Sequence, residues 1–263
     1  MRYLIIPFLF LVACANVKPS EANAEAEAPI LEEMPREVSP LLSPVLAAHG
    51  GIATWDGFGS LSFVAQYSPE RQESFLLDLI SRQERIVGSA YTMGYDGVNY
   101  WQVLEGETKP KNPEFMINLQ FYFFAMPFVL ADEGVNISVL PNRTIAGQEY
   151  EVLKATFGDG VGVASKDQYL LMIDPASKQL TYLLYSVTYF DAGRAERYNA
   201  AHYAAWQTVN GLQVPKTMIS YVWDAENETL GKERGRKEFR EVSFTAERPD
   251  ASIFARPAEA WEE

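Results

Sequence analysis

Alternation of apolar and polar residues predicts β-strands over most of the chain. Apolar side chains occupy every second position from Leu61 to Tyr67, as in a strand with one covered face. Asn210-Gly211, between two apolar runs, is typical of a tight hairpin turn, and Asp174 to Lys178 is a second turn. Strands without intervening helices favour an antiparallel sandwich or barrel. We expect further strands at about 73–87, 90–95 and 98–104, strands at about 166–173 and 179–190 on the two sides of the Asp174 turn, and one strand on each side of Asn210-Gly211.

Two helices interrupt this pattern. Ser39-Pro40 or Ser43-Pro44 starts a short helix that ends at His49-Gly50-Gly51, where glycine permits the left-handed cap and the imidazole meets the last carbonyls. The second, at 113–131, begins at Pro113 after Asn112 and has no polar face, since Asn118 and Gln120 are its only polar residues after the first turn. Such a helix is buried or membrane-inserted, and Pro127 and the two amides favour burial.

The 113–131 helix also suggests what it covers. From Leu180 to Phe190 both faces of the strand are apolar, so we expect a cover on the second face, and this helix is the candidate. It serves either as core filling or as the lining of an apolar cavity. The second alternative gives six candidate ligand-binding residues: Phe115, Leu119, Tyr122, Phe123, Met126 and Leu130.

The N-terminal residues predict an export signal. A base at Arg2 precedes an apolar run from Tyr3 to Val12, which is too short to span a bilayer. The run closes on Leu11-Val12-Ala13-Cys14, which resembles a bacterial lipoprotein signal. We therefore expect a signal peptide at 1–13, a lipidated Cys14 that anchors the chain to a membrane, and an acidic, Ala/Glu/Pro-rich tether at 14–38. Residues 39–263 then form one domain, and Ala15 points to the outer membrane.

Composition excludes several functions. The chain has 35 acidic and 22 basic residues in 263, a net charge of −13, and no run of bases, so nucleic acid is not an expected partner. Its single cysteine excludes an internal disulfide framework and the usual structural zinc sites. We expect no cofactor and no metal, and a monomer.

Several motifs together carry a resemblance to a known family. They comprise His49-Gly50-Gly51, Trp55, Leu61 with Phe63, Tyr95-Asp96-Gly97 with Trp101, Asp174-Pro175, Thr188-Tyr189-Phe190, Trp206, Asn210-Gly211, Pro215-Lys216 and Pro249 to Phe254. The pattern, over about residues 43–257, resembles an uncharacterised family of bacterial envelope lipoproteins related to the Lol-type lipoprotein-sorting proteins. The resemblance implies an incomplete antiparallel β-barrel, or half-barrel, whose concave apolar face is covered by helices and takes acyl chains in related members. The resemblance does not identify any individual ligand-binding residue in this chain.

The sequence contains no nucleophile elbow, phosphate loop or metalloprotease motif. The Gly158–Gly162 segment lies between strands, which favours a hairpin loop over a phosphate site. His49 is expected at a helix end, and His202 in a structural hydrogen bond. Asp132-Glu133 and the Asp191 and Glu196 pair are expected as solvated loop charges, and the mixed run Lys232 to Arg240 as an exposed, charge-protected edge strand.

Three hypotheses follow. The first is a non-catalytic envelope protein that binds an acyl chain, another apolar ligand or a lipoprotein, and that the Cys14 lipid holds at the membrane. The second is a protein–protein interaction module with a filled core. The third is a hydrolase, which requires His49 or His202 within hydrogen-bond reach of a Ser, Asp or Glu.

Overall fold

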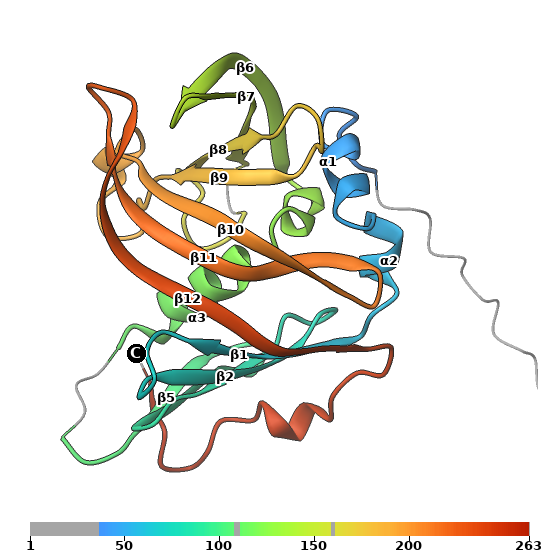
Figure 1. The fold of residues 1–263 in the computed structure, drawn as a ribbon. Helices are drawn as coiled ribbons and strands as arrows, with labels where there is room; N and C mark the ends of the chain where they lie inside the picture. Colours follow the sequence, from blue (N-terminus) through green and yellow to red (C-terminus); the bar gives the residue numbers. More distant parts are fainter. Residues whose placement is uncertain (1–36, 108–110, 159–160, 263) are drawn as a thin grey trace, which may run out of the picture. The chain divides into compact units, whose positions relative to one another are not determined.

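The strands form one unclosed antiparallel sheet that curves around a central helix. The computed structural model describes residues 37–107, 111–158 and 161–262, all within the unit Pro35–Glu263. Among these residues the sheet has thirteen strands in the order β13-β5-β4-β3-β2-β1-β12-β11-β10-β9-β8-β7-β6. The sheet edges β13 and β6 are not paired with each other, so the predicted mainly β half-barrel is confirmed (Figure 1).

The first half of the sheet follows the two N-terminal helices. These helices are α1 (Ser43–Ala48) and α2 (Ile52–Asp56). The strands are β1 (Ser60–Gln66), β2 (Gln72–Asp78), β3 (Glu84–Val87), β4 (Tyr91–Tyr95) and β5 (Tyr100–Leu104). The single strand predicted over 73–87 is wrong: a turn at 79–83 divides it, because Asp78 accepts hydrogen bonds from the backbone N–H of Ile80 and of Ser81.

The second half of the sheet consists mostly of long hairpins. Its strands are β6 (Val135–Ile145), β7 (Gln148–Phe157), β8 (Gln168–Ile173), β9 (Leu180–Tyr185), β10 (Asn199–Val209), β11 (Leu212–Asp224), β12 (Thr229–Thr245) and β13 (Trp261–Glu262). Both predicted hairpin turns are confirmed. Asn210 and Gly211 have φ of 49° and 85°, the left-handed pair that an Asn-Gly turn between twisted strands requires. Short 3-10 helices η2 (Ala192–Arg194) and η3 (Ala251–Ile253) precede β10 and β13.

The helix α3 (Pro113–Phe124) lies inside the curved sheet and contacts β4 and β5 (Figure 1). The Asn112 side chain caps it by accepting from the Phe115 N–H at 2.7 Å, as the sequence predicts. The helix ends earlier than predicted, before Pro127, because proline disfavours helical backbone in the residue before it. A separate 3-10 helix, η1 (Phe128–Ala131), follows.

Aromatic stacking joins α3 to the sheet in the main core. The Phe124 ring lies 4.2 Å from that of Phe63, which lies 4.4 Å from that of Phe75. At the C-terminal end of α3, the Tyr203 hydroxyl donates to the Phe123 carbonyl at 2.9 Å. These contacts fix the C-terminal half of the helix in the interior.

The two faces of β9 are both buried, but α3 covers only one of them. Leu183 belongs to the main core around α3. Tyr182 and Leu184 belong to a second cluster on the opposite face, built from β6 to β11. The expectation that the 113–131 helix covers the second face is therefore wrong, since neighbouring strands bury it instead.

The α1 helix ends as the sequence predicts. Gly50 and Gly51 have φ of 103° and 88°. A Cβ on Gly50 would lie 2.3 Å from the Gly211 carbonyl oxygen, so only glycine fits where α1 meets the β10–β11 turn. His49 Nδ1 lies 2.8 Å from the Val45 carbonyl oxygen, at the expected helix end.

Candidate functional site

The helix α3 presents one face to the core and another to open space. Ile117, Phe121 and Phe124 are at most 6% exposed and belong to the main core. Phe115 and Leu119, one helical turn apart on the other face, are half-buried. They are two of the six predicted ligand-binding residues, and each lines two cavities.

The larger cavity is an open cleft of about 630 Å³ between α3 and the sheet. This volume lies within the range of about 300–1,000 Å³ usual for small-molecule sites. Its apolar floor is Phe115 and Leu119, with Tyr185 and Val187 at the end of β9. We call this cavity the basic cleft, because six of its lining residues are basic: Arg71, Arg194, Arg197, Arg234, Arg236 and Lys237.

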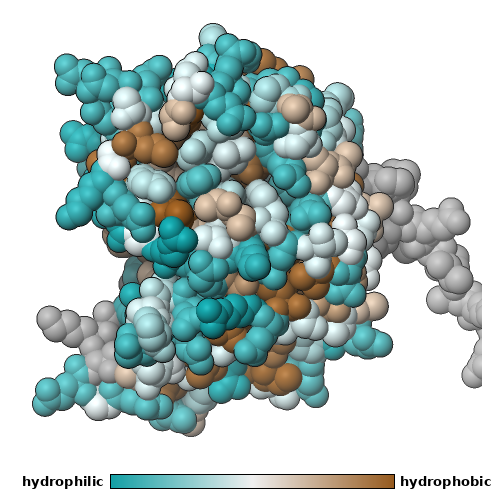
Figure 2. Space-filling model, viewed as in Figure 1, coloured by the Kyte–Doolittle hydropathy of each residue, from teal (hydrophilic) through white to brown (hydrophobic). Residues whose placement is uncertain are grey.

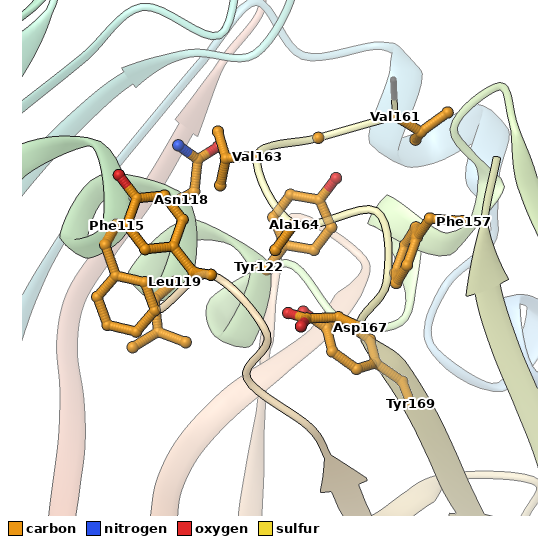
Figure 3. Close-up of a pocket in the computed structure, with 12 residues that line it drawn as sticks. Phe115, Asn118, Leu119, Tyr122, Phe157, Val161, Val163, Ala164, Asp167 and Tyr169 are labelled. Carbon is orange, nitrogen blue, oxygen red and sulfur yellow. The ribbon is translucent and has the colours of Figure 1, made fainter. Parts of the chain in front are cut away.

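The smaller cavity adjoins the same two side chains. It holds about 50 Å³ and is enclosed by α3 and the loop between β7 and β8, including Val161, Val163 and Ala164 (Figure 3). Tyr122 lines this cavity with Leu119, and Asn118 lies at its border. It is too small for a drug-sized ligand on its own.

The basic residues reach the cleft from separate parts of the fold. Arg71 lies between β1 and β2, Arg194 and Arg197 lie in the segment before β10, and Arg234, Arg236 and Lys237 lie on β12. Figure 2 shows hydrophilic side chains gathered along the left margin of the surface, over the ends of β11 and β12 and the segment before β10. No Asp or Glu is among the described residues that line the cleft.

Lys237 is the most confined of these bases. Its Nζ donates to Gln120 Oε1 on α3 at 2.5 Å and lies 5.7 Å from the Phe123 ring centroid. Burial lowers the pKa of Lys237 to about 8; nearby Glu73 opposes this shift, and Arg71 adds to it. In the described part of the chain no carboxylate lies within ion-pair distance of this ammonium.

A buried carboxylate, that of Glu73, lies next to the cleft and already has hydrogen-bond and ion-pair partners. Glu73 is 2% exposed and accepts hydrogen bonds from the hydroxyls of Tyr67, at 2.6 Å, and Tyr91. Its carboxylate is 3.5 Å from Arg71 and 3.7 Å from the Lys111 ammonium. Burial, together with the Glu73 charge, raises the pKa of both tyrosines. The cluster ties β2 to β4 and neutralises part of the Arg71 charge.

Three other predicted ligand-binding residues are deep in the core. Phe123, Met126 and Leu130 are 6%, 0% and 2% exposed, and the residues lining the two cavities do not include them. Cys14, the predicted lipidation site, lies outside the described residues.

Neither histidine has the geometry that the hydrolase hypothesis requires. His49 is fully buried between the rings of Trp206 and Phe128, and burial lowers its pKa to about 4 although the Val45 carbonyl opposes the shift. His202 stacks on Tyr182 at 4.4 Å, on the convex face, instead of making the expected hydrogen bond. Among the described residues, neither ring bonds to a Ser, Asp or Glu.

Two expectations about charged residues are corrected. The run from Lys232 to Arg240 belongs to β12, which pairs with β1 and β11 and is not an edge strand. Asp132 is not a solvated loop charge: the Arg82 guanidinium donates to both its carboxylate oxygens at 2.9 Å. The inward position of Lys237 could have been predicted from the sequence of this run. Side chains two positions apart on a strand lie on the same face, and Lys237 is two positions from Phe239, which is buried.

The described residues contain neither a metal-ligating cluster nor a membrane-spanning helix. No group of three or more His, Cys, Asp or Glu side chains is placed to hold a metal ion. None of the helices combines the length and apolar character needed to cross a bilayer.

An unclosed antiparallel sheet around an apolar helix defines the half-barrel class of protein, and comparisons place this chain near known examples. A family model described as a family of unknown function, DUF6503, matches residues 113–207, from the start of α3 into β10. No curated protein matches the chain.

Solved structures resemble the chain at low sequence identity. A LolA superfamily protein from Nitrosomonas europaea is 11% identical, with 75% of this chain and 88% of that chain covered and a TM-score of 0.45. A DUF1329 family protein from Desulfovibrio piger is 12% identical, with coverages of 77% and 93% and a TM-score of 0.44. An outer membrane lipoprotein-sorting protein domain from Vibrio parahaemolyticus is 11% identical, with coverages of 76% and 93% and a TM-score of 0.41. Two of these three structures are named as members of the Lol type that the sequence motifs resemble, and the likeness says nothing about the ligand of this chain.

Proposed function

We propose that this protein is a non-catalytic binding protein of the bacterial envelope whose ligand is a lipid or another molecule with an acyl chain. The observation that carries the proposal is the floor of the basic cleft. There Phe115 and Leu119 project from α3 into an open volume of about 630 Å³. A ligand that covers these apolar side chains removes them from water, which favours binding by about 25 cal/mol per Å² of apolar surface buried.

The proposal divides the predicted binding residues into two groups. Phe115, Leu119 and Tyr122 contact the acyl chain, because they line the cavities. Phe123, Met126 and Leu130 hold α3 and η1 in the core.

Anchoring belongs to the same proposal. A lipid on Cys14 holds the chain at the outer membrane, and residues 14–38 link the anchor to the half-barrel. A protein fixed in this way presents its cleft to ligands near one membrane surface and does not act as a diffusing shuttle.

Native mass spectrometry of the full chain, released from bacterial membranes in a nonionic detergent, tests the proposal. We expect a bound acyl lipid at one copy per protein, lost in Leu119→Asp. The matched control is Val222→Asp, because Val222 is 44% exposed on β11 and lies outside the residues lining the cleft. Thermal unfolding of both variants shows whether each retains its fold. Absence of any acyl species from the wild type, with another envelope protein recovered instead, would favour the interaction module.

A further inference from the structure

The charge of the basic cleft is opposite to that of the molecule as a whole. The chain carries a net charge of −13, yet among its described residues the cleft is lined by bases and by no acid. Like charges gathered in a concave surface raise the local potential and attract ions of the opposite sign. A cluster of this kind in an acidic protein therefore points to an anionic ligand.

Three of the five arginines that line the cleft have no opposite charge beside them, whereas Arg71 lies 3.5 Å from Glu73 and Arg236 lies 3.9 Å from Glu238. Arg234 donates to the side-chain oxygen of Asn199 at 3.1 Å, which is a neutral partner. Arg194 and Arg197, among the described residues, have no carboxylate within 4.0 Å. All three are exposed at the cleft and free to turn toward a ligand.

Lys237 supplies a second, independent observation. Folding removes its ammonium from water against α3, and its bonded partner is the neutral Gln120 amide. Glu73 attracts this charge only from beyond ion-pair distance and does not offset the cost of burial, so the charged form of Lys237 is disfavoured as the structure stands. A ligand anion in the cleft would supply a counter-charge in direct contact.

Apolar and basic surfaces meet at one place. Phe115 and Leu119 line the basic cleft and also the small apolar cavity beneath the β7–β8 loop. A molecule that contacts both kinds of surface has an anionic end and an apolar end.

We propose that the basic cleft binds the phosphate group of an anionic amphiphile, with Arg194, Arg197, Arg234 and Lys237 around the phosphate and the acyl part on Phe115 and Leu119. Guanidinium groups pair with phosphate oxygens through two parallel hydrogen bonds, which favours phosphate recognition by a site with three arginines. The inference rests on the proposed function, since it names the class of lipid that the same site takes.

Calorimetric titration of the full chain in neutral maltoside micelles tests it with three probes. These are dihexanoyl phosphatidylglycerol, whose phosphate charge is unbalanced, dihexanoyl phosphatidylcholine, which has the same chains but whose phosphate charge is balanced by its own choline ammonium, and inorganic phosphate. Competition by the detergent is equal for the two lipids, so the ratio of their affinities reports the headgroup. We expect the anionic lipid to bind at least about tenfold more tightly than the zwitterionic one, and phosphate alone to bind much more weakly than either.

Exposed arginines allow variants that leave the fold intact. Arg197→Gln and Arg234→Gln should each weaken binding of the anionic lipid about tenfold and leave phosphatidylcholine binding unchanged. Arg240→Gln is the matched control, because Arg240 is an exposed arginine on β12 that does not line the cleft. It should leave the affinities for both lipids unchanged.

The outcomes separate the two proposals. Equal affinity for the two lipids overturns the anion site and leaves the acyl-binding function standing. Binding of neither lipid removes both proposals. Phosphate as tight as the anionic lipid overturns the assignment to an amphiphile, and arginine variants that behave like Arg240→Gln overturn the assignment to this cleft.

Discussion

The ammonium of Lys237 on β12 and the side-chain amide of Gln120 on α3 are joined by a hydrogen bond of 2.5 Å inside the half-barrel. This bond connects the sheet to the helix that forms the floor of the basic cleft. A neutral acceptor satisfies one proton of the ammonium but does not balance its charge. The pair therefore holds a positive charge at the junction of apolar and basic surfaces, where the proposed ligand changes from chain to headgroup.

Affinity for an anionic lipid should depend on pH through Lys237. Burial lowers the pKa of Lys237 to about 8, so the ammonium loses its charge between pH 7 and pH 9.5. Neighbouring Tyr67 stays neutral in this range because burial, aided by Glu73, raises its pKa. We expect wild-type affinity to fall several-fold over the interval, and that of Lys237→Arg to stay constant, as measured by calorimetry. An equal fall in both would exclude Lys237 as the titrating group.

Removing the Lys237 charge should separate binding from stability. The double variant Lys237→Met with Gln120→Leu replaces a desolvated ammonium and its amide partner by apolar groups of similar size. We expect its free energy of unfolding to equal or exceed that of the wild type by up to about 2 kcal/mol, with binding of the anionic lipid lost. Denaturant unfolding measures the first quantity. A variant much less stable than the wild type would show that the pair is structural.

The two faces of α3 should respond differently to truncation. Phe124 is fully buried and stacks on Phe63 at 4.2 Å, so Phe124→Ala should lower the free energy of unfolding by about 3–5 kcal/mol. Phe115 is half-buried at the cleft, so Phe115→Ala should lower it by about 1 kcal/mol and weaken lipid binding instead. Urea denaturation compares the two variants. Equal losses of stability would mean that Phe115 is core.

His49 should make the fold sensitive to acid. Burial lowers its pKa from 6.5 to about 4, so the unfolded chain takes up this proton more readily than the folded one. Its contribution to stability is complete above pH 6.5 and declines as the pH falls toward 4, by about 3 kcal/mol in total. The loss of stability between pH 7 and pH 4.5 should be smaller in His49→Gln than in wild type. His202→Gln, at a half-buried site, is the control. It should alter the loss of stability between pH 7 and pH 4.5 by less than His49→Gln does.

Two buried carboxyls should respond to pH in opposite directions. Burial alone raises the pKa of Glu84 well above its usual value, so its contribution is present at low pH and is lost as the pH rises. Burial also acts on Asp78, but hydrogen bonds from Ser81, Arg248 and Ile80 outweigh it and lower the pKa. Glu84→Gln should therefore raise stability at pH 7.5 by more than about 1 kcal/mol, and Asp78→Asn should reduce it. Melting temperatures at pH 4 and pH 7.5 test both, and a shift of the same sign in the two variants would contradict the assignment.

Local patterns in the sequence predicted much of the fold. The Asn210-Gly211 turn, the glycine cap after His49 and the Asn112 cap of α3 each depend on a few neighbouring residues, so they could be predicted from the sequence. The length of α3 and the division of 73–87 could not, because both depend on how Pro127 and Asp78 act on surrounding backbone.

The candidate site could be predicted only in its apolar half. Leu119 and Phe115 belong to one continuous segment, whose composition marks it as buried. The basic half consists of residues from β12, the β1–β2 turn and the segment before β10, which are close only after the sheet curves. A linear search for a run of bases cannot detect such a cluster in a chain of net charge −13.

Photo-cross-linking in the intact envelope tests the central claim most directly. A benzophenone amino acid at position 119 lies on the floor of the basic cleft, and the same group at position 222 lies on β11 outside the residues lining it. After irradiation of whole cells and purification of the full chain, mass spectrometry of the labelled peptides identifies the partner. The account predicts acyl-lipid adducts at position 119, absent at position 222 and reduced by Arg234→Gln. Protein adducts alone at position 119, or equal lipid labelling at the two positions, would contradict it.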